Sequence, residues 1–133
     1  VLRAERAGRG TPGRVAGAGA VAPNRRLGAG PATGPAGQIS LVASNMGWRT
    51  HELVVLLLAA GAAGQRVPGA DGKVDETGSL GEASNSCAAG VGDGITAGGV
   101  GWTTLTLKAG HHELLCNLAS HYADGMYQEL IVT

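Results

Sequence analysis

The stretch C116-N-L-A-S-H-Y-A-D-G-M126 decides the expected fold, because two strands and three potential metal ligands meet in it. The segments on either side, HELLC and MYQELIV, alternate in the way that is typical of β-strands. Four residues separate Cys116 from His121, and four more separate His121 from Met126. The sequence therefore predicts a loop that is fixed at both ends by strands and carries a thiol, an imidazole and a thioether.

Further short strands are expected upstream of this loop. Residues 38–44 place Ile39, Leu41 and Ala43 on one face, as a half-buried strand does. Residues 51–58 are a dense run of Val and Leu, which predicts a strand buried on both faces, with a short helix as the alternative. The expected strands are 38–44, 51–58, 101–108, 112–116 and 126–132. Ala109-Gly110 is expected as a hairpin turn, and residues 59–72 and most of 78–101 as Gly-rich connections.

Composition fits one small domain with many turns, since 24 of the 133 residues are Gly and only 3% are aromatic. Residues 1–36 are rich in Gly, Ala and Arg without a recurring apolar face, so we expect an irregular, low-complexity segment, of which residues 1–30 are disordered or loosely attached. Residues 37–133 are expected to be the folded domain. Residues 1–37 hold six Arg and one Glu, whereas the rest holds four basic and nine acidic residues. This mildly acidic domain argues against nucleic-acid binding.

The side chains of the loop suggest a particular metal. Thiolate and thioether sulfur with imidazole nitrogen suit copper, whereas carboxylate and carbonyl oxygen suit Mg or Ca. A second imidazole is available from His51, which begins a predicted strand. Two His, one Cys and a weak axial Met form the ligand set of blue copper sites.

These segments resemble the cupredoxin family, and most of all its rusticyanin- and sulfocyanin-type members. The loop is similar to their C-x-x-x-x-H-x-x-x-G-M pattern, and N45-x-G-x-x-x-H51-E-L-V-V is similar to their first-ligand region. The resemblance covers about residues 36–133. It implies an all-β, Greek-key β-sandwich and one type 1 copper ion, with His51, Cys116 and His121 as equatorial ligands and Met126 as the axial ligand. The N-terminal segment departs from the family, whose members normally begin with a strand.

The resemblance also implies a function. A mononuclear type 1 copper protein would carry single electrons between Cu(II) and Cu(I), and it would not be an enzyme. The alternatives are a copper carrier or storage module with the same ligands, and a metal-free structural domain. We expect transient redox partner proteins, a monomer and an extracytoplasmic location. The chain begins at Val without a visible signal, so it is expected to be a mature form or a fragment from which an upstream membrane anchor could be missing.

Residues near the ligands receive supporting roles. Asn45 is expected to tie the two ligand-bearing loops together by side-chain hydrogen bonds, with a simple turn residue as the alternative. Met46, Trp48 and Tyr122 are expected to form a rim on which a partner docks, with plain packing as the alternative.

The remaining Cys and His residues are expected to have no part in the site. A disulfide between Cys87 and Cys116 would remove the thiolate ligand, so no disulfide is expected and Cys87 is expected as a free thiol. His111 and His112 lie beside the predicted turn, and we expect surface residues there in preference to a second metal site.

Overall fold

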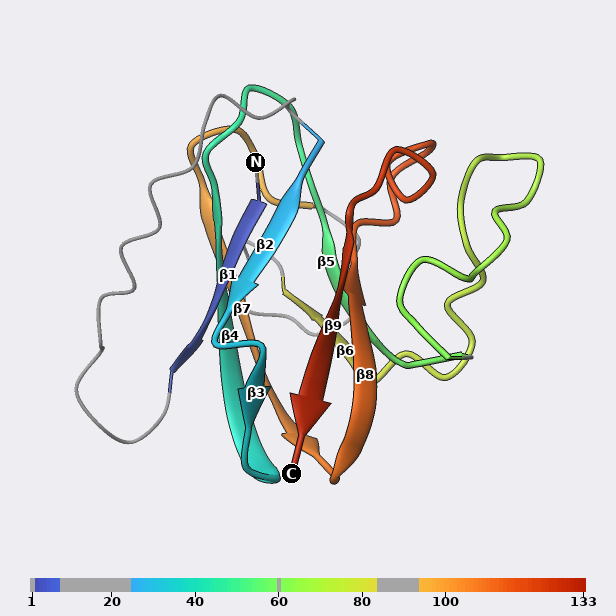
Figure 1. Cartoon of the computed structure of the whole chain (residues 1–133). Coiled ribbons are helices and arrows are strands. Elements are labelled where there is room, and N and C mark those ends of the chain that lie inside the picture. Colours follow the sequence, from blue (N-terminus) through green and yellow to red (C-terminus); the bar gives the residue numbers. More distant parts are fainter. Residues whose placement is uncertain (1, 8–24, 60, 84–93) are drawn as a thin grey trace.

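The computed structural model describes residues 2–7, 25–59, 61–83 and 94–133, with strands in two sheets. The first sheet contains β1 (Leu2–Ala7), β2 (Leu27–Gly30), β4 (Gly37–Asn45) and β7 (Val100–Leu107). The second contains β3 (Thr33–Gly34), β5 (Leu53–Leu57), β6 (Gly81–Ala83), β8 (Gly110–Leu115) and β9 (Tyr127–Val132). Their orders are β2-β1-β4-β7 and β3-β9-β8-β5-β6. The two sheets face each other, and the connections β4–β5 and β8–β9 lie at the same end (Figure 1).

The core between the sheets follows from strict alternation along the strands. β4 and β7 bury every second residue and pair antiparallel over their length. Ile39, Leu41 and Ala43 of β4 thereby enter one buried cluster with Leu105 and Leu107 of β7. Burial of each such side chain contributes about 1.5–3 kcal/mol for Leu or Ile. The strand expected at residues 38–44 is confirmed, and so is the one at 101–108.

β5 is buried on both faces, as the Val/Leu run predicts. Leu53 and Val55 join the core between the sheets. Val54 and Leu56 point the other way and pack with Val74, which lies in the connection between β5 and β6. This connection covers the outer face of the second sheet, and Figure 1 shows it in green to yellow beside β8. The strand interpretation is therefore correct and the helix alternative is wrong.

The N-terminal expectation is wrong for three short stretches. Residues 1–36 were expected to be irregular, but Leu2–Ala7, Leu27–Gly30 and Thr33–Gly34 form strands. β1 lies between β2 and β4 and pairs with both. Ala4 is buried in the core, where a small side chain suffices. Main-chain pairing, and not a run of large apolar residues, defines these strands; residues 8–24 lie outside the described residues.

Two other expectations need correction. Ala109-Gly110 does not close a hairpin, because β7 and β8 belong to opposite sheets and the chain crosses between them here. The stretch 78–101, expected to be mostly loop, contains the short strand β6, which pairs with β5. Alternation identifies strands but does not say which strand is the neighbour in a sheet.

None of the described residues forms a helix long and apolar enough to cross a membrane.

Candidate metal centre

His51 lies at the end of the sandwich, just before β5. Its main chain forms an isolated bridge with Ile95, in which His51 N–H donates to Ile95 O at 3.1 Å and Ile95 N–H donates to His51 O at 2.6 Å. The His51 side chain is fully buried. The bridge therefore fixes the main chain on both sides of this imidazole.

Cys116 and Met126 lie opposite each other at the two ends of the loop. Cys116 directly follows β8 and Met126 directly precedes β9, and these strands pair antiparallel with Leu115 opposite Tyr127. Cys116 N–H donates to Met126 O at 3.0 Å, and Met126 N–H donates to His121 O at 3.1 Å. The loop is thus closed at its base by one hydrogen bond and folded back on itself by another.

Three donor atoms converge at this end of the molecule. His51 Nδ1 lies 3.2 Å from His121 Nδ1, and Cys116 Sγ lies 3.3 Å from His121 Nδ1 and 3.9 Å from His51 Nδ1. All three residues are buried, and they are the one group of His, Cys, Asp or Glu among the described residues that is arranged to hold a metal ion. The structure therefore brings together three of the four residues expected as ligands.

The size of this triangle fits a metal ion. A point equidistant from the three atoms lies about 2 Å from each, close to first-row metal bonds such as Zn–N at about 2.0–2.1 Å and Zn–S at about 2.3 Å. Both imidazoles offer Nδ1; Cys116 and His121 come from one loop, and His51 comes from a distant part of the chain. The donor set of two nitrogens and one sulfur is soft enough to favour copper or zinc over Mg or Ca. The residues present fit the expected metal site.

Met126 is also placed beside the triangle. Its side chain is fully buried in the same cluster as Cys116. Its main chain bonds to both Cys116 and His121, as described above. These contacts are compatible with an axial ligand and equally with a core residue, so the axial role stays a prediction.

Burial controls the chemistry of the thiol. Desolvation raises the pKa of Cys116 to about 11, and main-chain N–H groups of Glu52 and Leu118 offset part of this rise. Glu52 N–H donates to Cys116 Sγ at 3.2 Å. This bond joins Glu52, which directly follows His51, to the sulfur of Cys116. Without a metal ion the side chain is therefore a protonated thiol at neutral pH.

The second imidazole is kept neutral. Burial lowers the pKa of His121, and the positive charges of Arg25 and Arg49 lower it further, although Asp124 opposes them. Arg25 forms an ion pair with Asp124, which lies in the same loop as His121. A neutral imidazole has a free lone pair for a metal ion.

Asn45 holds the first-ligand region in place. Its buried amide donates to Arg49 O at 2.6 Å and to Ile95 O at 2.7 Å, and its carbonyl oxygen accepts from Gly47 N–H at 3.0 Å. The amide thus connects the residues before His51 to the bridge partner of His51. Because both amide hydrogens are used in this way, none remains for the loop of Cys116. Asn45 therefore supports the His51 region, and among the described residues its side chain does not make the expected link to the loop of Cys116.

The three residues expected at a docking rim have different positions. Met46 and Trp48 are 68% and 79% exposed, as a rim requires. Tyr122 is only 2% exposed and packs with Leu115 and Val74 on the outer face of the second sheet. The expectation for Tyr122 is therefore wrong, because residues that follow one another in this loop point in different directions.

The other Cys and His residues have mixed outcomes. Cys116 is a free cysteine, as expected, and Cys87 lies outside the described residues. His111 is exposed and pairs with Glu129 at 2.5 Å, as a surface residue would. His112 is buried instead, and burial lowers its pKa.

Several contacts of the ligand loop have no signal in the sequence. The side chain of Asn117 bonds both the N–H and the C=O of Val74, at 2.8 and 3.0 Å. Ser120 N–H donates to Gly72 O at 2.9 Å. Both partners lie in the connection between β5 and β6, more than forty residues away in the chain. Only the three-dimensional structure reveals that this connection supports the loop.

Comparison with known structures identifies the fold. The chain is similar to reduced rusticyanin, with a TM-score of 0.51 and 19% identity over 99% of this chain and 77% of that chain. Rusticyanin from Thiobacillus ferrooxidans matches 99% of this chain and 75% of that chain, with 19% identity and a TM-score of 0.45. The sequence matches no family model and no curated protein. The first likeness confirms the expected all-β, cupredoxin-like sandwich.

The buried thiol leads to a prediction about the pH dependence of metal binding. At neutral pH the thiol of Cys116 is protonated and His121 is neutral, so binding of Zn²⁺ should release about one proton. The apparent affinity for Zn²⁺ should then rise about tenfold per pH unit between about pH 7 and pH 9. Competition with a zinc-binding dye measures this, after correction for the dye's own pH dependence. Zn²⁺ is chosen because it cannot oxidise the thiol.

The matched control is Cys116→Ser, which should bind more weakly and lose this pH dependence. Equal affinity of the unaltered protein across the range would contradict a protonated thiol as the source of the ligand.

Proposed function

We propose that this chain, which has a cupredoxin-like fold, is a mononuclear type 1 copper protein that carries single electrons. The observation that supports this most is the buried triangle formed by His51 Nδ1, Cys116 Sγ and His121 Nδ1. Met126 is proposed as the axial ligand and completes the set. Copper would supply a reversible one-electron couple between Cu(II) and Cu(I).

The chain's own part in this function is to hold the ligands still. His51 is held by the bridge to Ile95, and Cys116 by its hydrogen bonds to Met126 and Glu52. Cu(I) and Cu(II) prefer different coordination geometries, so ligands that are free to move would rearrange at every electron transfer. A site held between these preferences needs little rearrangement, and transfer is then fast.

Burial favours an electron carrier over a copper carrier with the same ligands. His51 and Cys116 are fully buried, and His121 is 5% exposed. Release of a metal ion to a partner would require these side chains to become accessible, whereas an electron can pass without such exposure. A reversible potential with fast self-exchange would support the electron carrier, and facile loss of copper to a chelator would support the copper carrier.

A partner protein is proposed to dock beside the ligands. Met46 and Trp48 are exposed in the turn between Asn45 and His51. A small apolar surface suits transient docking, because it excludes water without forming a tight interface. We propose these two residues as the docking rim, together with an extracytoplasmic location and a monomeric state.

The first prediction for this function concerns colour. Addition of Cu(II) should produce an intense visible band, because the Cys116 thiolate can donate charge to the metal ion. Cys116→Ser should abolish the band, since an alcohol is a poor ligand at this site. Optical and EPR spectra are the measurements, and a Ser variant that keeps the colour would exclude Cys116 as the ligand.

The second prediction concerns the reduction potential. A weak thioether favours Cu(I) more than an oxygen donor does, and no donor at all favours it further. Met126→Gln should therefore lower the reduction potential and Met126→Leu should raise it. Voltammetry of the three proteins tests this order. Identical potentials would show that Met126 is a core residue and not an axial ligand.

The third prediction concerns the docking rim. Trp48→Asp should leave the copper spectrum unchanged but slow electron self-exchange, because two copies meeting at this rim would then bring like charges together. Trp102→Asp is the matched control, since Trp102 is also exposed but lies on β7. NMR line broadening in mixtures of oxidised and reduced protein measures the rate. Equal rates for both variants would place electron entry elsewhere.

A further inference from the structure

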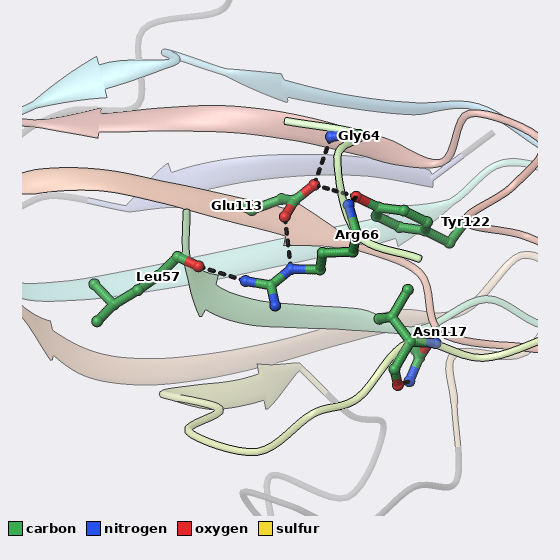
Figure 2. A network of polar contacts seen from close by, with 7 residues as sticks. Leu57, Gly64, Arg66, Glu113, Asn117 and Tyr122 are labelled. Carbon is green, nitrogen blue, oxygen red and sulfur yellow. Dashed lines mark hydrogen bonds and ion pairs between the residues drawn. The ribbon is translucent and has the colours of Figure 1, made fainter. Parts of the chain in front are cut away.

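A buried polar network lies on the outer face of the second sheet (Figure 2). Its centre is the carboxylate of Glu113 on β8, which is 1% exposed. Glu113 Oε1 accepts from Gly64 N–H at 2.8 Å and from the Tyr122 hydroxyl at 2.7 Å. Glu113 Oε2 accepts from Arg66 Nε at 2.7 Å. The carboxylate thus joins β8, the connection between β5 and β6, and the ligand loop.

The network is satisfied in both charge and hydrogen bonding. The guanidinium of Arg66 pairs with Glu113 and also donates to Leu57 O. The Tyr122 oxygen accepts from the main-chain N–H of Arg66 at 3.1 Å, while its hydroxyl donates to Glu113. Burial raises the pKa of Tyr122 to about 12, so the hydroxyl keeps its proton at neutral pH. A buried carboxylate with this number of partners holds its neighbours in one arrangement.

Tyr122 directly follows the ligand His121. The Tyr122 ring is buried with Val54, Leu115 and Val74, and it packs against Tyr127 with ring centroids 5.1 Å apart. His121 points the opposite way, with Nδ1 in the donor triangle. One peptide unit therefore joins a fixed aromatic anchor to a metal-binding imidazole. Any rotation of this unit that moved His121 would have to pull Tyr122 out of its packing.

Two further contacts hold the same loop from the same side. Ser120 N–H donates to Gly72 O, and the Asn117 amide bonds the main chain of Val74. Gly72 has φ +75°, and a Cβ at this position would lie 2.9 Å from Ser120 N. Glycine is therefore required for this close approach. The loop is therefore attached to the β5–β6 connection on both sides of His121: at Asn117 and Ser120 before it, and at Tyr122 after it.

From this arrangement we propose that Tyr122, held by Glu113 and Arg66, is the positioning residue of the ligand loop and fixes the orientation of His121. Its effect on copper rests on the function proposed above, whereas its effect on the loop does not. Tyr122 does not touch the metal site itself; it acts through the main chain that it shares with His121.

The test compares Tyr122→Phe with Ser40→Ala. The first variant keeps the buried ring but removes the hydroxyl that donates a hydrogen bond to Glu113. The second removes a hydroxyl that bonds Thr104 Oγ1 at 2.8 Å, between β4 and β7 of the other sheet. Amide hydrogen exchange of the metal-free proteins is measured first. Tyr122→Phe should speed exchange in residues 117–125 about tenfold relative to the strands, and Ser40→Ala should leave these residues unchanged.

Copper-loaded proteins provide the second readout. Tyr122→Phe should change the copper hyperfine splitting in EPR and shift the reduction potential, and Ser40→Ala should change neither. The proposal is overturned if the loop of Tyr122→Phe exchanges at the original rate. It is also overturned if the copper spectrum and potential of this variant are unchanged, and the network then has a purely structural role. If the unaltered protein shows no thiolate band while Tyr122→Phe still frees the loop, the electron-carrier function fails and the positioning of His121 stands.

Discussion

The antiparallel pairing of β8 with β9 is the constraint on which the rest of the site depends. Because Leu115 lies opposite Tyr127, the next residues outward, Cys116 and Met126, face each other and join by a main-chain hydrogen bond. On the other side of β8, β5 pairs so that Val54 lies opposite Leu115. This register brings the N–H of Glu52 to the Cys116 sulfur and His51 to the triangle. A shift of β8 by one residue would turn Cys116 to the outer face, and a shift of β9 would do the same to Met126.

The same arrangement has a cost in the absence of a metal ion. Burial withdraws two imidazoles and a thiol from water, and it raises the pKa of the Cys116 thiol and lowers that of the His121 imidazole. Buried polar groups that lack full hydrogen bonding destabilise a fold by about 1–3 kcal/mol each. A metal ion that binds only the folded state returns this free energy by mass action. The β5–β6 connection and the Asn45 amide therefore do what the metal ion cannot do before it binds: they keep the donors together.

Much of this organisation could be predicted from the sequence, and the parts that could not share a physical reason. The spacing of Cys116, His121 and Met126 is local, so it identifies the ligand loop directly. Alternation in residues 38–44 and 101–108 identifies strands, because one face of each is buried. The pairing of β1 with β4 has no such signal, since Ala4 is small and the strand is held by main-chain hydrogen bonds. The burial of Tyr122 depends on Glu113 and Arg66, which approach it only through the tertiary fold.

The two imidazoles are held by different means, and this bears on how the site can respond to a change in charge. His51 forms a main-chain bridge with Ile95. The buried side-chain amide of Asn45 bonds both Ile95 and Arg49, which precedes His51 in the chain. His121 belongs to a loop that is held from outside the sheet, through Tyr122 and a charged pair. The main chain of His51 is thus held directly by two hydrogen bonds, whereas His121 is held through the side chain of its neighbour Tyr122. In the electron carrier proposed above, His121 would therefore be the ligand that adjusts to a change in charge, and the Glu113 network would limit how far it moves.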